Sequence, residues 1–419
     1  MPRLTIAVSV FLFCAVCLSL LFNNSIALSQ QTDPPKEDKT PPPVLFSVTL
    51  NYEFGKGKEA FDAAKDLILK NYYSSTLTED TLYFAAIRGM LRHISPPENP
   101  EHSRLLLPEQ AKKIEQSLSG KTVSIGITGQ LDPQDGSYTI SEVVPGSPAD
   151  GVLDVFDRIL RIDGESLKGK QQKDADDLLA GDEGTKVMLT VVRDIRVFDI
   201  QIERKEFKVP NMKVYELPDQ IVVVEMQKMT DKISTELETE LGKLKKRQIK
   251  KLIIDLRNNP GGLFKEGLDL ADLFLDERAI ELRVIVNAAD HQKIVAATPN
   301  PFDFNLVILV NKNTASSCEI FTAALQDHKK AKVIGTSTYG KSIIDSLYKL
   351  PNEYRIQFIS GSMYSPNGKS WYRTGLTPDI EVQQDSATYT DVAKLPPAQR
   401  LEKDAPLLSA YNYFKNPLP

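Results

Sequence analysis

The stretch Leu306-Val307-Ile308-Leu309-Val310-Asn311-Lys312-Asn313-Thr314-Ala315-Ser316-Ser317-Cys318-Glu319-Ile320 runs from an apolar segment through a polar turn into a helical pattern. The apolar segment is long enough only for a buried strand, and the apolar positions from 320 to 325 recur at helical spacing. The polar residues therefore form a strand-to-helix turn. A hydroxyl there lies beside the unpaired amides that open the helix, which can stabilise a developing oxyanion. Helix capping is the commoner reason for a serine at this position.

A lysine follows Ser316 by 25 positions, within Thr338-Tyr339-Gly340-Lys341. The two residues together suggest a serine nucleophile that is activated by a lysine base. A lysine accepts a proton only as the neutral amine, a form that burial at a strand end with few counterions favours. Considered alone, Lys341 would be interpreted as a surface lysine in a glycine turn.

The second half of the chain alternates strand and helix patterns. Apolar runs at residues 221–224, 252–256, 279–286 and 306–310 are separated by helical stretches, most clearly at 230–247 and 264–275. This order predicts an α/β arrangement with a mostly parallel buried sheet. Reactive groups in such sheets lie at the strand ends, where the next helix begins.

Residues 120–205 have a different period, with short alternating runs separated by turn signals such as Asp135-Gly136 and Asp163-Gly164. The segments Val143-Val144-Pro145-Gly146-Ser147-Pro148-Ala149 and Asp157-Arg158-Ile159-Leu160-Arg161-Ile162-Asp163-Gly164 strongly resemble a PDZ domain. Such domains add a peptide as an extra strand and capture its terminal carboxylate with backbone amides. The candidate peptide-binding residues are Ser124, Ile125, Gly126 and Ile127.

Three motifs resemble signatures of the carboxyl-terminal processing proteases, also called tail-specific proteases, a family of serine/lysine peptidases with a PDZ domain. They are Leu252-Ile253-Ile254-Asp255-Leu256-Arg257-Asn258-Asn259-Pro260-Gly261-Gly262, the segment of Ser316 and Lys341, and Tyr364-Ser365-Pro366-Asn367-Gly368 with Gly375-Leu376-Thr377-Pro378-Asp379-Ile380. The resemblance covers about residues 60–382. It implies a multidomain α/β fold: a crotonase-like or Clp-protease-like α/β core, an inserted or preceding PDZ domain and an N-terminal helical segment.

The resemblance also assigns roles within the site. Ser316 would attack the peptide bond, and Lys341 would take its proton and return it to the departing amine. The backbone amides of Gly262 and Ser317 would form the oxyanion hole, where a glycine lets an amide turn towards substrate without a Cβ. The alternative for Gly262 is a simple turn glycine.

This chain departs from the family pattern at three places. Asp345 stands where the family usually has a glutamine four residues after the lysine. As a carboxylate near Lys341, Asp345 would favour the charged amine, so it is a candidate modulator of the lysine. Cys318 replaces a serine and is interpreted as a small buried residue, with a reactive thiolate as the alternative. Val155-Phe156 stands where a glycine usually precedes Asp157.

Composition limits the remaining functions. The 51 basic and 56 acidic residues are interspersed and give a net charge of −5, which argues against a nucleic-acid surface. The four histidines (His93, His102, His291 and His328) show no metal-ligand spacing, so no metal or other cofactor is expected. Cys14 and Cys17 lie in the apolar N-terminus, and a processed chain would retain Cys318 alone.

The N-terminus predicts export. Arg3 precedes an apolar run to Phe22, and Ser25-Ile26-Ala27 offers a cleavage site, with an uncleaved membrane anchor as the alternative. We expect the bacterial periplasm or cell envelope. The predicted divisions are a signal peptide or anchor at 1–27, a Pro-rich linker at 28–45, an N-terminal helical region at 46–119, the PDZ domain at 120–205, the protease cap and core at 206–382, and a C-terminal tail at 383–419.

The leading hypothesis is an exported serine endopeptidase that recognises the C-terminal tails of proteins through its PDZ domain and cuts with a Ser316/Lys341 dyad. Its partners would be proteins or peptides with exposed C-termini. An activating partner protein, a homodimer formed through the helical region and a membrane tether remain open. The alternatives are a catalytically inactive PDZ-containing peptide-binding scaffold of the same fold, prompted by Asp345, and a cysteine hydrolase that uses Cys318.

Overall fold

The computed structural model describes residues 57–74, 76–95, 102–286, 290–384, 392 and 395–415. The expected signal peptide or anchor and the Pro-rich linker lie outside these residues. None of the helices in the described part combines the length and apolar character needed to cross a membrane.

A six-stranded sheet forms the centre of the predicted protease core, in the order β10-β11-β12-β15-β16-β19. β10 pairs antiparallel with β11, and the other four pairings are parallel, as the sequence predicts. The strands are β10 (Met212–Leu217), β11 (Ile221–Met226), β12 (Lys251–Asp255), β15 (Asn305–Val310), β16 (Ala331–Gly335) and β19 (Ile380–Glu381). β11, β12 and β15 are almost continuously apolar because both faces of this sheet are covered.

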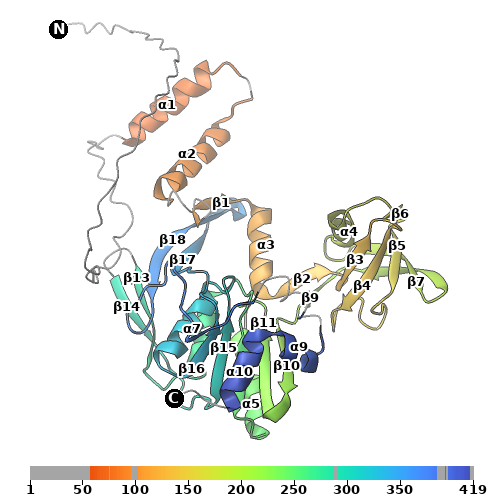
Figure 1. The fold of residues 1–419 in the computed structure, drawn as a ribbon. Helices are drawn as coiled ribbons and strands as arrows, with labels where there is room; N and C mark the ends of the chain where they lie inside the picture. The colour runs from red at the N-terminus through yellow and green to blue at the C-terminus, as the bar shows by residue number, and fades with distance from the viewer. Residues whose placement is uncertain are drawn as a thin grey trace, which may run out of the picture. The chain divides into compact units, whose positions relative to one another are not determined.

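Alternate residues of each strand enter two different cores, as the period of two requires. Ile254 and Ile308 pack in the cluster that includes α5 (Ile233–Lys246), α6 (Phe264–Asp272) and α7 (Ser317–Asp327). Ile253 and Val307 pack in the cluster that includes α10 (Ala405–Lys415). Figure 1 shows α7 and α10 beside the strands of this sheet.

The apolar run at 279–286 does not join the parallel sheet. It forms β13 (Ile280–Val286), which pairs antiparallel with β14 (Asp290–Val295) and with β18 (Arg355–Tyr364). β18 also pairs with β17 (Ile343–Lys349) and with β1 (Arg104–Leu106), so a second, antiparallel sheet carries the segment after Lys341. An apolar run alone does not determine which sheet it will join.

The predicted PDZ domain has the strand order β3-β4-β5-β7-β8, with β6 paired to β5. Its elements are β3 (Ile127–Asp132), β4 (Ser137–Val143), β5 (Arg158–Ile162), β6 (Glu165–Ser166), α4 (Gln172–Leu179), β7 (Lys186–Arg193) and β8 (Arg196–Glu203). The ribbon of β2 (Lys121–Ser124) and β9 (Lys205–Lys208) flanks it in the chain. Phe156 has φ of 75° and is 81% exposed, so it occupies a left-handed position that suits glycine.

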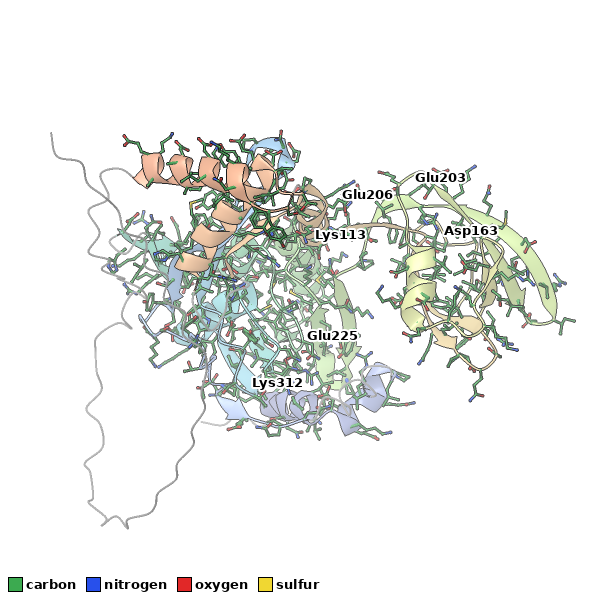
Figure 2. All side chains as sticks on the ribbon, turned by 90° about the horizontal axis from the view of Figure 1, so that it is seen from above. Lys113, Asp163, Glu203, Glu206, Glu225 and Lys312 are labelled. Carbon is green, nitrogen blue, oxygen red and sulfur yellow. The ribbon has the colours of Figure 1, made fainter. Side chains whose placement is uncertain are left out.

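Helices precede and follow these sheets. The first are α1 (Gly57–Asn71), α2 (Glu79–Ile94) and α3 (Pro108–Ser119), and α1 has no buried residue. The segment expected as a C-terminal tail contains α9 (Pro397–Lys403) and α10. Two ion pairs hold these last helices: Arg257 contacts Asp404 in a buried pair, and Arg400 contacts the half-buried Glu225, which Figure 2 labels on β11. The helices between residues 397 and 415 are therefore part of the core.

Candidate active site

Ser316 lies at the predicted turn between β15 and α7, immediately before the helix begins. Its backbone has φ of 58° and ψ of −121°, a conformation that residues with a Cβ rarely adopt. Strained backbone of this kind persists only where the surroundings fix it. Thr314 Oγ1 donates to the Leu256 carbonyl at 2.8 Å, and the Ala315 amide donates to the Asn259 carbonyl at 3.1 Å. The turn is thus held against the loop that follows β12.

That loop carries the two glycines. The buried Asn259 side chain accepts from the Gly261 amide at 2.9 Å and donates to the Met226 carbonyl at 2.9 Å. A Cβ at Gly261 would lie 2.9 Å from the Ser316 Cβ, and one at Gly262 would lie 2.1 Å from the Met229 carbonyl oxygen. Both positions exclude a larger residue because neighbouring groups approach too closely. Gly262 is therefore more than a turn glycine.

The amides of Gly262 and Ser317 have no hydrogen-bond acceptor among the residues that the structure describes. Met229 bonds instead to the residues on either side of Gly262, through Gly261 and Leu263. The Ser317 amide opens α7, whose first amides have no partner within the helix. Two donors near Ser316 thus remain available to an oxyanion, which is the arrangement that acyl transfer requires.

Glu319 connects the serine turn to the lysine segment. Its fully buried carboxylate accepts from the Ser316 amide at 2.8 Å, the Lys341 amide at 2.9 Å and the Gly340 amide at 2.8 Å. It also accepts from Thr338 Oγ1 at 2.6 Å. Burial raises the pKa of Glu319, although these hydrogen bonds act in the opposite direction. One side chain therefore fixes the backbone of both proposed catalytic residues.

No role was predicted for Glu319 from the sequence. The signal for its role was present, because a glutamate three residues after a serine at a helix start is the pattern of a capping box. Its bonds to residues 338–341, however, depend on a segment about twenty positions later, which no local pattern reveals.

Lys341 Nζ donates to Asp345 Oδ2 at 2.8 Å, with the two side chains 26% and 10% exposed. Asp345 therefore does approach the lysine, as a modulator of the lysine would have to. The same oxygen contacts His102 Nδ1 at 2.8 Å. From the sequence, His102 was considered only as a possible metal ligand, because 243 positions separate it from Asp345. No cluster that could hold a metal ion occurs in the described part of the chain.

Cys318 is buried on the inner face of α7 and is fully inaccessible to solvent. Burial raises the pKa of its thiol well above the ordinary value, with the charge of Glu319 adding to the effect. A thiol in these surroundings stays protonated and cannot reach a substrate, so the geometry disfavours the cysteine hydrolase.

Comparisons with known proteins identify two regions of the chain. A model of peptidase family S41 matches residues 220–382, and a model of the PDZ domain matches residues 139–193. The chain is 30% identical over 332 residues to a probable CtpA-like serine protease of Staphylococcus aureus (strain bovine RF122 / ET3-1), a match that covers 78% of this chain. A peptidase domain of family S41 thus occupies residues 220–382.

The other similar proteins fit this family. A probable CtpA-like serine protease of Staphylococcus haemolyticus (strain JCSC1435) is also 30% identical over 332 residues. The chain spans 65% of the length of these two relatives. The crystal structure of a putative S41 protease from Bacteroides fragilis shares the fold, with a TM-score of 0.54 and 17% identity over 85% of this chain and 97% of that one.

The candidate peptide-binding residues run from the last residue of β2, Ser124, to the first residue of β3, Ile127. The Ile125 side chain is buried, and the Gly126 amide already donates to Ser124 Oγ at 3.0 Å. The Gly126 and Ile125 carbonyls accept from Val144 and Ala149, which fixes the loop. A carboxylate that binds here would have to replace the Ser124 hydroxyl as the partner of the Gly126 amide. The role of these four residues stays a prediction.

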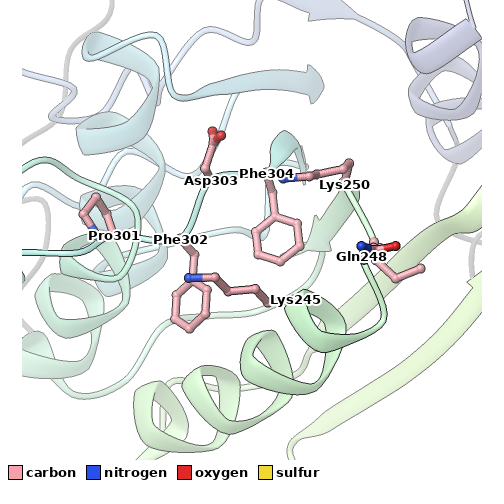
Figure 3. Close-up of a pocket in the computed structure, with 8 residues that line it drawn as sticks. Lys245, Gln248, Lys250, Pro301, Phe302, Asp303 and Phe304 are labelled. Carbon is pink, nitrogen blue, oxygen red and sulfur yellow. The ribbon is translucent and has the colours of Figure 1, made fainter.

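A pocket of about 350 Å³ lies away from this S41 site. Figure 3 shows Lys245, Gln248 and Lys250 facing Phe302 and Phe304 across it. These residues precede β12 and β15, whereas Ser316 and Gly262 follow the same strands. The pocket is therefore at the amino ends of the parallel strands, opposite to the edge where such sheets carry their active sites.

Proposed function

We propose that this protein is an exported serine endopeptidase that binds the C-terminal tail of a protein through its PDZ domain and cleaves the chain with Ser316 and Lys341. Ser316 attacks the carbonyl carbon while its proton passes to the neutral Lys341 amine. The oxyanion accepts hydrogen bonds from the Gly262 and Ser317 amides. Lys341 then gives the proton to the departing amine, and water releases the acyl group by the same steps.

The observation that carries the proposal is the pair of bonds from Glu319 to the Ser316 and Lys341 amides, at 2.8 and 2.9 Å. They hold the serine turn and the lysine segment to one buried carboxylate. The S41 peptidase domain supports peptidase chemistry, and the PDZ domain supports recognition of a peptide end. Export rests on the apolar N-terminus.

The second candidate is a peptide-binding scaffold without activity. The ion pair between Lys341 and Asp345 favours it, because a lysine held as an ammonium cannot act as a base. The scaffold and the peptidase share every feature of the PDZ domain, so only turnover separates them.

The test is cleavage of an unfolded protein by the intact chain, by Ser316→Ala and by Lys341→Ala. We expect both substitutions to reduce cleavage by about 1,000-fold or more, and Cys318→Ser to leave most of it. A substrate whose C-terminus is amidated should be cut more slowly than one with a free carboxylate. Cleavage that survives both substitutions would exclude the dyad, and a folded wild type that cuts no substrate would favour the scaffold.

A further inference from the structure

One oxygen of Asp345 is shared by two basic side chains. Asp345 Oδ2 lies 2.8 Å from Lys341 Nζ and 2.8 Å from His102 Nδ1. The other oxygen, Oδ1, is buried and has no hydrogen-bond partner among the described residues. The Asp345 and His102 side chains are only 10% and 15% exposed, so solvent screens this cluster weakly.

The antiparallel sheet brings these groups together. Asp345 is on β17, at a register irregularity against β18, a feature that commonly redirects a side chain. His102 lies two residues before β1, which pairs with the same strand β18. The contact is therefore built by strand pairing, although its members come from distant parts of the chain.

The charge on Asp345 restricts what Lys341 can do. A carboxylate in these surroundings needs a positive partner, and a lysine that supplies the charge holds the proton that a base must lose. The imidazole offers a second place for that proton. One proton shared between the two bases gives either an ammonium with a neutral imidazole or a neutral amine with an imidazolium, and Asp345 is paired in both.

We propose that His102 is a positioning residue of the peptidase site: as an imidazolium it takes over the charge of Asp345 and leaves Lys341 as the neutral amine beside Ser316. This inference rests on the proposed Ser316 and Lys341 dyad. The proton balance is closed, because Lys341 Nζ loses one proton and the imidazole gains one, with Asp345 a carboxylate throughout. A histidine thereby compensates for the acid that stands where the family usually has a neutral glutamine.

Three charged groups on the surrounding elements have partners of their own. Glu319 on α7 accepts from the amide of Lys341, not from its side chain. Arg104 on β1 donates to Gln357, and Arg355 on β18 donates to Glu115. The pH response of the site should therefore depend on Lys341, Asp345, His102 and the buried Glu319.

The test is a double-mutant cycle on cleavage of an unfolded protein, with His102→Gln, Asp345→Gln and the double variant. Glutamine can donate to Asp345 but cannot carry a charge. We expect His102→Gln to lower kcat/KM by about 10- to 100-fold at neutral pH, and to move the half-maximal rate to higher pH. In the Asp345→Gln background the same change should have no effect, because no carboxylate is left to compensate. His328→Gln, at the far end of α7, is the matched control.

An equal loss from His102→Gln in both backgrounds, or no loss in either, would overturn the inference. Ser316→Ala and Lys341→Ala are measured in parallel. If cleavage survives them, the proposed function fails; if it depends on them but not on His102, only this inference fails. A readout without turnover is the NMR titration of the His102 ring. Its midpoint should rise in Lys341→Met, where His102 is the remaining partner of Asp345, and an unchanged midpoint would also contradict the proposal.

Discussion

Replacing Glu319 by glutamine should disable the site while leaving the protein folded. Each carboxylate oxygen of Glu319 accepts two bonds: Oε1 from Thr338 Oγ1 and the Gly340 amide, and Oε2 from the Ser316 and Lys341 amides. A glutamine keeps only one oxygen. Whichever way it is turned, two donors then face an NH₂ group that cannot accept.

The size of the effect follows from these bonds. A buried donor without an acceptor costs about 1–3 kcal/mol, so two of them cost about 2–6 kcal/mol. Burial raises the pKa of Glu319, which means that desolvation of the ionised carboxylate opposes folding. Glutamine removes that penalty, which offsets part of the cost, so the free energy of unfolding should fall by less than about 6 kcal/mol. The Ser316 turn and the Lys341 segment would be held less firmly. We therefore expect kcat/KM to fall about 100-fold, which corresponds to about 2.7 kcal/mol of activation free energy.

The assay compares kcat/KM on an unfolded protein with thermal unfolding of the same samples. Asp272→Asn is the matched control, because Asp272 accepts from the Ala297 amide, the Thr298 amide and Thr298 Oγ1 away from the site. A Glu319→Gln enzyme with wild-type kcat/KM would refute the reasoning. So would an activity loss that merely follows unfolding, or an equal loss in the control.

Two further predictions concern stability. Phe156→Gly should stabilise the PDZ domain by about 1 kcal/mol, because glycine adopts the left-handed backbone conformation of this position without strain and the 81% exposed side chain loses little burial. Phe156→Ala keeps the Cβ and should not stabilise the domain, and chemical unfolding measures both variants. Glu281 is 3% exposed, and burial together with the charges of Asp272 and Asp269 raises its pKa to about 8. The folded state then binds the proton more tightly, so stability falls as pH rises from about 4.5 to 8. Glu281→Gln should remove this decline, so that the free energy of unfolding rises by up to about 5 kcal/mol above pH 8 and changes little at pH 5. Identical pH profiles of unfolding for the wild type and the variant would contradict this prediction.

Local sequence patterns predicted those parts of the site that depend on local structure. The turn at Ser316 follows from an apolar strand and a helical period that meet there, and the glycines after β12 follow from a strand that ends in Pro260-Gly261-Gly262. The parallel order of β11, β12, β15 and β16 follows from the helices between them, because parallel neighbours need a crossover.

The parts that escaped prediction depend on pairing between distant segments. β13 has the apolar composition of a core strand, yet it pairs with β14 and β18 because a hairpin partner follows it directly in the chain. The helices after residue 395 were expected only as a tail, since their anchor, Asp404, finds its partner Arg257 about 150 positions earlier. The contact between His102 and Asp345 was not predicted either, because it depends on the pairing of β1 with the distant strand β18.

Glu319 and the Asp345 cluster act on different parts of the site, which explains how this chain departs from the family pattern at residue 345. The backbone positions of Ser316 and Lys341 are set by Glu319, whose bonds to their amides do not involve the side chain of residue 345. An acid in place of a neutral amide therefore changes the charge around Lys341 without moving its backbone. A change of charge can be offset by another charge, and His102 lies at hydrogen-bond distance from the same oxygen. A substitution at Glu319 cannot be compensated in this way, because no single neighbouring group could replace the four hydrogen bonds that its carboxylate accepts.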